Sequence, residues 1–329
     1  MRDYHLCGLG NAIVDIFVEV SDQEFATLGY ERGSMRLVEL ADQKMLLERF
    51  KDREPRLVSG GSVANSVIAF SQLGGAAAFI GCVGDDRYGL FYAGEFEELD
   101  IDIGNPVIVG EATGTCAVLI TPDAERTMRT CLAVSSHLAA RHVDAERIKN
   151  SDWLFIEGYV FANPSGQTAI KEAIRIAKEH GVKVAVTCSE AFIVEIFHEP
   201  FFEALRQSDL LFANEREACA LTKTSRAEDA FAKLKDLAPA SVVTAGPGGA
   251  FVRYGGVEAH VPAFPCEPKD LTGAGDMFAG AFLYGVTHGV PPQQAARGAC
   301  FLAMKVITQI GARLHHGVQH LWQEGIAAR

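Results

Sequence analysis

The sequence is short of basic residues and has no long hydrophobic run. Its 30 lysine and arginine residues stand against 42 aspartate and glutamate residues, which gives a formal net charge of −12. Nucleic acids and anionic membranes attract basic surfaces, so this balance predicts neither kind of partner. No apolar stretch approaches the roughly 18 residues of a membrane span. The N-terminal residues also lack the apolar core of a signal peptide.

The eight cysteines are scattered and form no C-x-x-C pair. Most stand beside apolar residues, where a free cysteine behaves as a small hydrophobic side chain. We therefore expect buried free thiols, a reducing compartment and a cytoplasmic location. Proline-rich linkers, runs of charge and internal repeats are absent too, which predicts one domain over residues 1–329 rather than two.

Apolar strands alternate with amphipathic helices along most of the chain. The sequence predicts strands at 6–9, 13–20, 77–83, 153–156, 182–187, 210–213 and 241–244, and hairpins at 115–121/127–132 and 251–254/258–262. Helices are expected at 63–73, 165–180, 200–206, 215–221 and 227–237, with helices at 274–288 and 293–307 completing the chain. This order indicates an α/β fold with a mostly parallel central sheet, helices on both faces and a small additional β-sheet.

The segment Asp270-Leu271-Thr272-Gly273-Ala274-Gly275-Asp276 carries the strongest chemical signal. Small residues at 273–275 let the backbone approach a ligand and present N–H groups at a helix start, where anions are favoured. A carboxylate in the first turn, Asp276, can take a proton from an attacking hydroxyl. A tight packing turn is the alternative interpretation of such a short glycine motif.

This segment resembles the C-terminal signature of the ribokinase-like carbohydrate kinases, the PfkB family. Three further motifs occur in the order typical of that family. They are Gly10-Asn11 with Asp15, the run Gly60-Gly61-Ser62-Val63-Ala64-Asn65 followed by Gly81 to Gly89, and Asn214-Glu215-Arg216-Glu217. The resemblance spans residues 10–282 and implies a ribokinase-like fold and ATP-dependent phosphoryl transfer to a substrate hydroxyl.

The resemblance implies a role for each matching position. Asp276 is the expected base, with Gly273, Ala274 and Gly275 as the anion hole. Asn11, Asp15, Gly60, Gly61, Ser62 and Asn65 are expected to contact the substrate. Asn214, Thr244, Gly246 and Gly249 are expected at ATP, and Glu217 at Mg²⁺ through water. Backbone oxygens of Asp270 and Thr272 are candidates for a K⁺ site, although Leu271 replaces the threonine of the family pattern.

Within the family, Thr113 to Thr121 and the Gly10 to Asp15 segment look more like adenosine kinases than sugar kinases. The implied β-sheet lid comprises about residues 12–38 and 107–135, and its apolar residues would cover a flat base. Met35, Leu37, Cys116 and Leu132 belong to this set, and Tyr159 would stack on the base. The expected acceptor is thus the 5′-hydroxyl of adenosine.

Several alternatives stay open. The apolar residues of the lid also match the ordinary alternation of a β-strand. They are then suited to packing within the lid or to a homodimer formed through it. Asn214 and Glu217 match a helix capping box, and the glycines after Thr244 match a hairpin turn. A kinase for ribose, fructose or a related sugar is the second functional candidate, and a non-catalytic nucleoside or nucleotide sensor is the third. A dinucleotide-binding dehydrogenase is disfavoured because no G-x-G-x-x-G follows the first strand.

Overall fold

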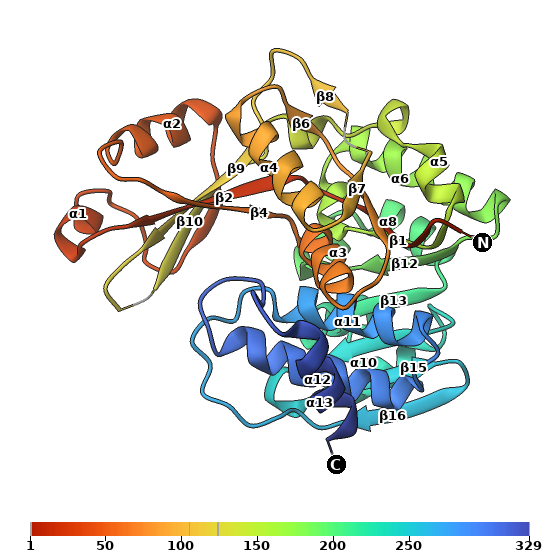
Figure 1. The fold of residues 1–329 in the computed structure, drawn as a ribbon. Coiled ribbons are helices and arrows are strands. Elements are labelled where there is room, and N and C mark those ends of the chain that lie inside the picture. The colour runs from red at the N-terminus through yellow and green to blue at the C-terminus, as the bar shows by residue number, and fades with distance from the viewer. Residues whose placement is uncertain (1, 105, 124, 329) are drawn as a thin grey trace.

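A computed structural model of the chain describes residues 2–104, 106–123 and 125–328. Its main sheet has nine strands in the order β16-β15-β14-β13-β12-β11-β1-β5-β7, seen in Figure 1. All neighbours from β14 to β7 are parallel, and β15 and β16 add an antiparallel edge. The strands are β1 (Tyr4–Leu9), β5 (Ala77–Ile80), β7 (Ile101–Ile103), β11 (Ser151–Ile156), β12 (Lys183–Thr187), β13 (Leu210–Asn214), β14 (Ser241–Thr244), β15 (Ala250–Tyr254) and β16 (Val257–Val261). The predicted mostly parallel α/β fold is confirmed.

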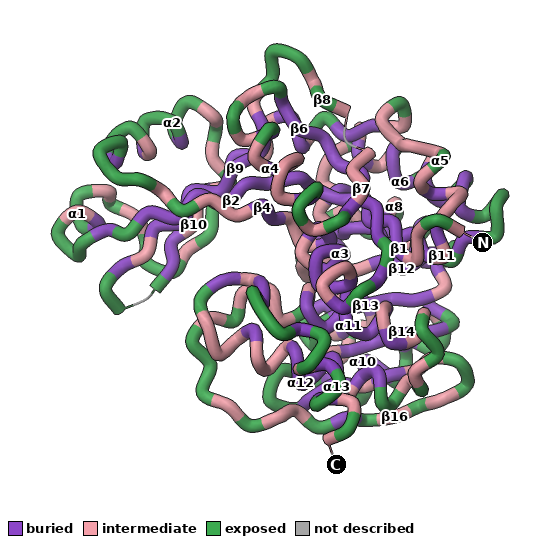
Figure 2. Tube along the Cα trace, viewed as in Figure 1, coloured by how far each residue is buried: buried purple, intermediate pink, exposed green. Residues whose placement is uncertain are grey.

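Successive strand residues enter two separate cores, one on each face of the sheet. Leu6 and Phe155 belong to the first core, whereas their neighbours Cys7 and Leu154 belong to the second. The first face is covered by α3 (Ser62–Gln72), α4 (Arg87–Glu98), α11 (Ala274–Thr287), α12 (Pro292–Ile307) and α13 (Val318–Ala327). The second is covered by α5 (Ala145–Lys149), α6 (Pro164–Glu179), α7 (Ala191–Ile196), α8 (His198–Leu205), α9 (Glu215–Thr222) and α10 (Ala227–Leu234). Figure 2 shows the central strands buried between these layers.

A second sheet projects from the body at the left of Figure 1. Its five strands run in the order β3-β10-β9-β2-β4, and with two flanking helices they form what we call the lid. The strands are β2 (Ile13–Glu19), β3 (Met35–Leu37), β4 (Arg56–Gly60), β9 (Gly114–Ile120) and β10 (Arg126–Cys131), and the helices are α1 (Asp22–Ala26) and α2 (Leu40–Glu48). The lid therefore includes residues 40–60, outside the expected ranges. Residues 107–108 lie elsewhere, because β8 (Val107–Ile108) pairs with β6 (Val83–Gly84).

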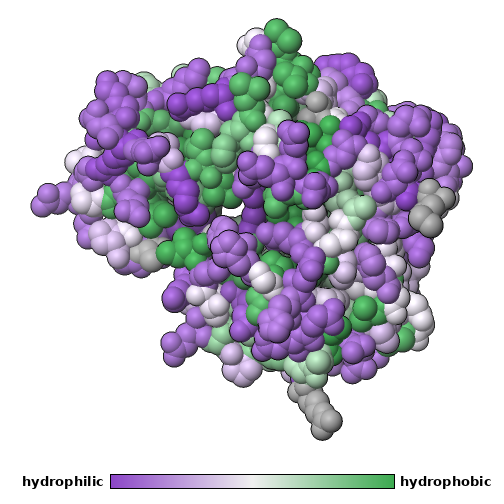
Figure 3. Space-filling model, viewed as in Figure 1, coloured by the Kyte–Doolittle hydropathy of each residue, from purple (hydrophilic) through white to green (hydrophobic). Residues whose placement is uncertain are grey.

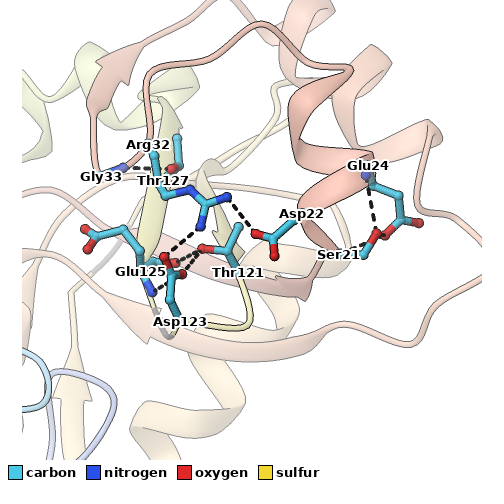
Figure 4. Close-up of polar contacts among 9 residues, drawn as sticks. All are labelled: Ser21, Asp22, Glu24, Arg32, Gly33, Thr121, Asp123, Glu125 and Thr127. Carbon is cyan, nitrogen blue, oxygen red and sulfur yellow. Dashed lines mark hydrogen bonds and ion pairs between the residues drawn. The ribbon is translucent and has the colours of Figure 1, made fainter.

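The two faces of the lid differ in what they contact. On the outer face, Phe25 and Leu46 from the two helices pack against Ile16, Val18 and Leu119. At the lid tip, Arg32 joins two acidic residues, donating to Asp22 Oδ1 at 2.7 Å and to Asp123 Oδ2 at 2.6 Å, as Figure 4 shows. The opposite face of the lid is turned toward the body (Figure 1).

The C-terminal segment corrects the prediction that two helices complete the chain. A third helix, α13, follows, and its Trp322 is 2% exposed. The indole packs so closely on α12 that a Cβ at Gly298 would lie 2.5 Å from it. Among the described residues, no helix is both long and apolar enough to cross a membrane. In the described part of the chain, short 3₁₀ helices also occur at Ala133–His137, Ala140–His142, Gly158–Ala162 and Gly246–Gly248.

Candidate active site

The site is centred on the start of helix α11. Gly273 precedes the helix with φ of 77°, a left-handed conformation that favours glycine. A Cβ at this position would lie 2.5 Å from the carbonyl oxygen of Ala312, so the backbone of the C-terminal segment leaves no room for a side chain. At Gly275 the space beside the backbone is open. The helix start is therefore fixed on one side and accessible on the other.

Asp276 in the first turn of α11 faces the start of another helix, α3. Ser62 Oγ donates to Asp276 Oδ1 at 2.7 Å, and Asn65 Nδ2 donates to Asp276 Oδ2 at 2.9 Å. The α3 start is placed by Gly61, where a Cβ would lie 2.0 Å from the carbonyl oxygen of Asn11. Ser62 and Asn65, expected at the substrate, thus hold the carboxylate of Asp276 in one orientation.

Burial raises the pKa of the Asp276 carboxyl to about 6, even though the hydrogen bonds from Asn65 and Ser62 and the charge of Arg313 oppose the rise. At neutral pH the group is therefore mostly ionised, yet it binds a proton far more readily than an exposed aspartate does. That combination suits a general base, which must accept a proton from a hydroxyl while remaining unprotonated between turnovers.

A cavity of about 380 Å³ opens beside Asp276. The carboxyl ends of parallel strands meet at one edge of a sheet, and ligands of open α/β sheets bind there. Asn214 ends β13 and Thr244 ends β14, and both line this cavity with Gly273, Gly275 and Asp276. Tyr159, Glu190, Glu217 and Thr272 line it as well. Tyr159, expected on the acceptor base, therefore shares its cavity with Asn214 and Thr244, two of the residues expected at ATP.

Asn214 and Glu217 form a complete capping box at the start of α9. Glu217 N donates to Asn214 Oδ1 at 3.0 Å, and Glu217 accepts from the backbone and side-chain nitrogens of Asn214 at 2.8 and 2.7 Å. Burial raises the pKa of Glu217 to about 7. Because both carboxylate oxygens have partners, a metal ion would reach this side chain most easily through water. The described residues contain no cluster of three or more His, Cys, Asp or Glu side chains suited to a metal.

The loop after Thr244 is a hairpin turn that joins β14 to the antiparallel β15. Ala245 N donates to the carbonyl oxygen of Gly249 at 2.8 Å, which closes the turn. Gly249 has φ of 87°, and a Cβ there would lie 2.0 Å from the carbonyl oxygen of Val261. Gly246 is exposed, with φ of 51°. The hairpin interpretation is thus correct, and the turn lies at the same sheet edge as the cavity.

On the substrate side, Asp15 is a carboxylate with no hydrogen-bond partner among the described residues. It lies on β2 beside Gly60, where a Cβ would come within 3.2 Å of its Oδ2. Burial raises the pKa of Asp15 to about 6, against the charges of Arg126, Arg313 and Arg56. A partly buried carboxylate with free acceptor positions is suited to bind hydroxyl groups.

The strand register of the lid aligns the expected base-covering residues on one face. Asp15, Cys116, Thr130 and Leu37 occupy one row across β2, β9, β10 and β3. Phe17, Val118, Met128 and Met35 occupy the next row. Met35 and Leu37 are 46% and 63% exposed, and the partly buried Leu132 packs against the small apolar cluster that contains Cys116. Figure 3 shows the hollow between the lid and the C-terminal part of the molecule.

Arg126 connects the lid to the loop before α11. Its guanidinium forms a buried ion pair with Asp270 and donates to Thr272 Oγ1 at 2.8 Å. Asp270 also accepts from the backbone N–H groups of Thr272 and Gly311. Burial alone would raise the pKa of Asp270, but these hydrogen bonds and the charge of Arg126 hold it below its usual value. The loop before α11, which leads to the expected anion hole, is therefore bound to the lid.

Known proteins resemble this chain along most of its length. Residues 35–316 match the pfkB family of carbohydrate kinases. The chain belongs to the PfkB family. Adenosine kinase 1 of Arabidopsis thaliana is 26% identical over 330 residues, covering 93% of this chain and 94% of that protein.

Two solved structures are also similar. A probable sugar kinase from Rhizobium etli CFN 42 is 30% identical with a TM-score of 0.89, covering 99% of this chain and 100% of that one. The adenosine kinase of Sinorhizobium meliloti is 31% identical with a TM-score of 0.87, covering 98% and 99%. The expected family, its fold and kinase activity are therefore confirmed for this PfkB protein, whereas the acceptor is not decided by its relatives.

Two residues of this PfkB kinase were not expected at the site. Glu157, at the end of β11, is 1% exposed and accepts from Asn11 Nδ2 at 2.7 Å and from Val63 N at 3.1 Å. Asn11 Oδ1 accepts in turn from Ser135 Oγ at 3.2 Å. The acidic residue after a buried strand, followed by glycine, was the sequence signal for Glu157. The other residue, Arg313, has no local signal, because its partners come from three distant segments.

Proposed function

We propose that this PfkB kinase transfers the γ-phosphoryl group of ATP to the 5′-hydroxyl of a nucleoside, with adenosine as the acceptor. The observation that carries the proposal is the position of Asp276. Its carboxylate lies at the start of α11, oriented by Ser62 and Asn65, at the edge of a cavity that the ends of β13 and β14 also line. This arrangement suits in-line transfer between two small molecules bound on either side of Asp276.

In this proposal Asp276 accepts the proton of the acceptor hydroxyl as the oxygen attacks phosphorus. The pKa of about 6 keeps the carboxylate ionised at neutral pH. The N–H groups of Gly273, Ala274 and Gly275 would stabilise the charge on the transferring group, because helix-start amides favour anions. The rigid contact of Gly273 with Ala312 fixes these donors before the reaction begins.

Asp15 is proposed to bind hydroxyl groups of the acceptor, with Gly60 and Gly61 allowing close approach of the chain. The lid face that includes Met35, Leu37 and Cys116, which lie in two adjacent rows, would cover the base. This coverage favours a nucleoside over a free sugar, because a bare sugar offers no flat apolar surface for such residues to bury. In our proposal the lid moves as a unit on one kinase domain and closes over the acceptor, which excludes water.

Mg-ATP supplies the phosphoryl group when bound. Thr244, Gly246 and Gly249 lie at the sheet edge where its nucleotide would bind, together with Asn214. Glu217 would meet the ion through water, since Asn214 occupies both carboxylate oxygens. Backbone oxygens of Asp270 and Thr272 remain our candidates for K⁺. Tyr159 would then contact the nucleotide side of the site as well as the acceptor.

The test is a coupled assay of ADP release with Mg-ATP and a panel of acceptors: adenosine, inosine, ribose and fructose. Turnover on adenosine with a low KM supports the proposal. Turnover on ribose or fructose alone would retain Asp276 as the proposed base but would reject adenosine as the acceptor in favour of a free sugar. This second candidate is favoured by Thr272, a residue nearer to the sugar-kinase form of the motif, and by the 30% identical probable sugar kinase. Binding of adenosine without any turnover would indicate that the protein is a non-catalytic nucleoside or nucleotide sensor.

A homodimer through the lid is a further proposal. Strand β3 is an edge of the lid sheet, and its Met35 and Leu37 are exposed. Edge strands with exposed apolar residues are suited to pair with another chain. Light scattering of the purified protein, with Leu37→Asp as the comparison, measures whether the lid mediates association.

A further inference from the structure

Arg313 lies in the irregular segment between α12 and α13, and its residue is only 6% exposed. Each of its three side-chain nitrogens has a partner from a different element. Nε donates to Asn65 Oδ1 at 3.3 Å, Nη1 donates to Glu95 Oε1 at 3.1 Å, and Nη2 donates to Ser59 Oγ at 3.0 Å. A buried guanidinium with all its nitrogens engaged has one orientation, because any rotation would leave a buried donor without a partner.

The contact with Asn65 determines which way that amide points. Arg313 has only donors, so it requires the oxygen of the Asn65 amide rather than its nitrogen. The nitrogen is then directed to the other side, where it donates to Asp276 Oδ2 at 2.9 Å. Without Arg313 the amide would lose the partner that distinguishes its two ends, and Asp276 would lose a fixed donor.

The other two contacts join the same group to the lid. Ser59 lies on lid strand β4, and both its backbone N–H and its hydroxyl donate to Glu95 Oε2, at 2.7 and 2.6 Å. Glu95 on α4 accepts from Arg313 with its second oxygen. Ser59 immediately precedes Gly60 and Gly61, so the segment expected at the acceptor is attached to this network.

We propose that Arg313 is a positioning residue for the catalytic base: it orients the Asn65 amide toward Asp276 and ties that arrangement to lid strand β4 through Ser59 and Glu95. The proposal rests on the proposed function for its kinetic consequences. Arg313 itself does not touch the reacting atoms. It acts through Asn65, and through its charge near Asp276.

The charges around Asp276 make that cation important. Asp15 on β2, Glu157 after β11 and Glu217 on α9 all face Asp276 closely enough for its charge to raise their pKa values. Tyr159, in the 3₁₀ helix after β11, is also affected by Asp276. Arg313 is the cation that lowers the pKa of Asp276. Arg126 and Arg56 also lower the pKa of Asp15, and Arg216 lowers that of Glu217. For Asp276 itself, the removal of Arg313 takes away the cation that opposes the rise of its pKa.

The experiment compares wild type with Arg313→Met and Arg313→Lys, on the full-length protein. We expect kcat of Arg313→Met to fall about 10- to 100-fold, since small displacements of catalytic groups have effects of that size. The acid limb of kcat/KM should move upward by about one pH unit, because an opposite charge is lost. Arg313→Lys keeps the positive charge but lacks the planar guanidinium with its several donors. Its acid limb should therefore stay near that of wild type while kcat falls.

A double-mutant cycle with Asn65→Ala tests the route of the effect. The cycle uses Arg313→Lys, which keeps the charge. If Arg313 orients Asp276 through Asn65, this double variant loses no more activity than the worse single variant. Additive losses, or a wild-type kcat and acid limb in Arg313→Met, would overturn the proposal. Arg253→Met is the matched control, because Arg253 is a largely buried arginine on β15, paired with Glu258. It should leave kcat and the pH profile unchanged.

Two further measurements keep the result decisive. Arg313→Met leaves Glu95 without its cation and can fail to fold, so Arg313→Gln with Glu95→Gln removes both charges together. Carbon-13 NMR titration of Asp276, assigned with Asp276→Asn, reports the base without requiring turnover. An upward shift of the Asp276 pKa in Arg313→Met but not in Arg313→Lys, with no phosphorylation by wild type, would retain this inference and reject the proposed function. If wild type phosphorylates the acceptor while Arg313→Met shows neither a shift of the Asp276 pKa nor a loss of kcat, the proposed function is retained and this inference is rejected.

Discussion

The guanidinium of Arg126, on lid strand β10, forms a buried ion pair with the carboxylate of Asp270, 144 residues further along the chain. The same guanidinium donates to Thr272 at 2.8 Å, at the beginning of the segment that leads into α11. This contact joins the moving part of the proposed mechanism, the lid, to the segment proposed to stabilise the transferring phosphoryl group.

We expect Arg126→Gln to loosen the lid and to leave the buried carboxylate of Asp270 without its cation. Loss of one partner of a buried ion pair destabilises proteins by about 3 kcal/mol or more. ADP release in the absence of acceptor should rise, because water is no longer excluded, and the KM for the acceptor should increase. ADP release with and without acceptor, together with thermal unfolding, measures these effects.

Arg32→Gln is the control for that prediction. Arg32 also joins two lid carboxylates, Asp22 and Asp123, but their side chains are 65% and 52% exposed, as Figure 4 illustrates. Exposed ion pairs contribute about 0–1 kcal/mol, so we expect near wild-type stability and kinetics. Equal losses in the two variants would show that the Arg126 contact has no special role.

Asp276→Asn should lose about two to four orders of magnitude in kcat, the usual contribution of a general base. Its stability at neutral pH should not fall. The folded-state pKa of Asp276 is raised from 3.8 to about 6, so the contribution of this group to stability is full below pH 4 and is lost as pH rises through 6. Removing the charge avoids up to about 3 kcal/mol of that loss at pH 7. Turnover near that of wild type would exclude Asp276 as the base.

The pH dependence of kcat/KM should show an acid limb near pH 6. Below this value Asp276 is protonated, and activity should fall about tenfold per pH unit. Asp15 also has its pKa raised to about 6 by burial, so the limb of wild type can contain both groups. In Asp15→Asn the limb of Asp276 should persist by itself. A flat profile down to pH 5 in that variant would assign the limb to Asp15 instead.

Asp15→Asn should raise the KM for the acceptor more than it lowers kcat, because Asp15 is proposed to bind hydroxyls rather than to react. Loss of a hydrogen bond to a charged group costs about 1.5–3 kcal/mol, which corresponds to roughly 10- to 150-fold in KM. Adenosine lacking the 2′- or the 3′-hydroxyl identifies the contact. The analogue without the hydroxyl that Asp15 binds should bind wild type and Asp15→Asn almost equally well. If adenosine and both analogues respond to the substitution alike, Asp15 does not bind the ribose.

Replacement of K⁺ by tetramethylammonium tests the proposed cation site near Asp270 and Thr272. If backbone oxygens there bind K⁺, activity should fall at constant ionic strength and return on addition of K⁺. Because the cation would lie beside the anion hole, the effect should appear in kcat more than in the acceptor KM. Identical rates in both salts would remove K⁺ from the proposed cofactors.

The prediction from sequence was most accurate where the signal was local. Strands β11 to β14 and helices α6, α9 and α11 lie within a few residues of their expected ranges, because each has a clear apolar period and a polar or glycine boundary. It was least accurate for the lid, where β4 and α2 were not expected. Helix α2 buries only Gln43 and Leu46, so its sequence has almost no apolar face to detect. Helix α13, which was not expected either, has apolar residues at 318, 321, 322 and 326, a spacing typical of a helix.

The sequence by itself determined the family, the α/β order of elements and the position of Asp276 at a helix start. These features depend on residues that are close together in the chain: glycines at a turn, an apolar period, a carboxylate in a first turn. Only the tertiary structure decided that Asn65 and Ser62 donate to Asp276, that Arg126 binds Asp270 in the loop before α11 and that Arg313 donates to Asn65. Each of these contacts joins segments more than 140 residues apart, and sequence spacing carries no information about which distant side chains will share a buried hydrogen bond.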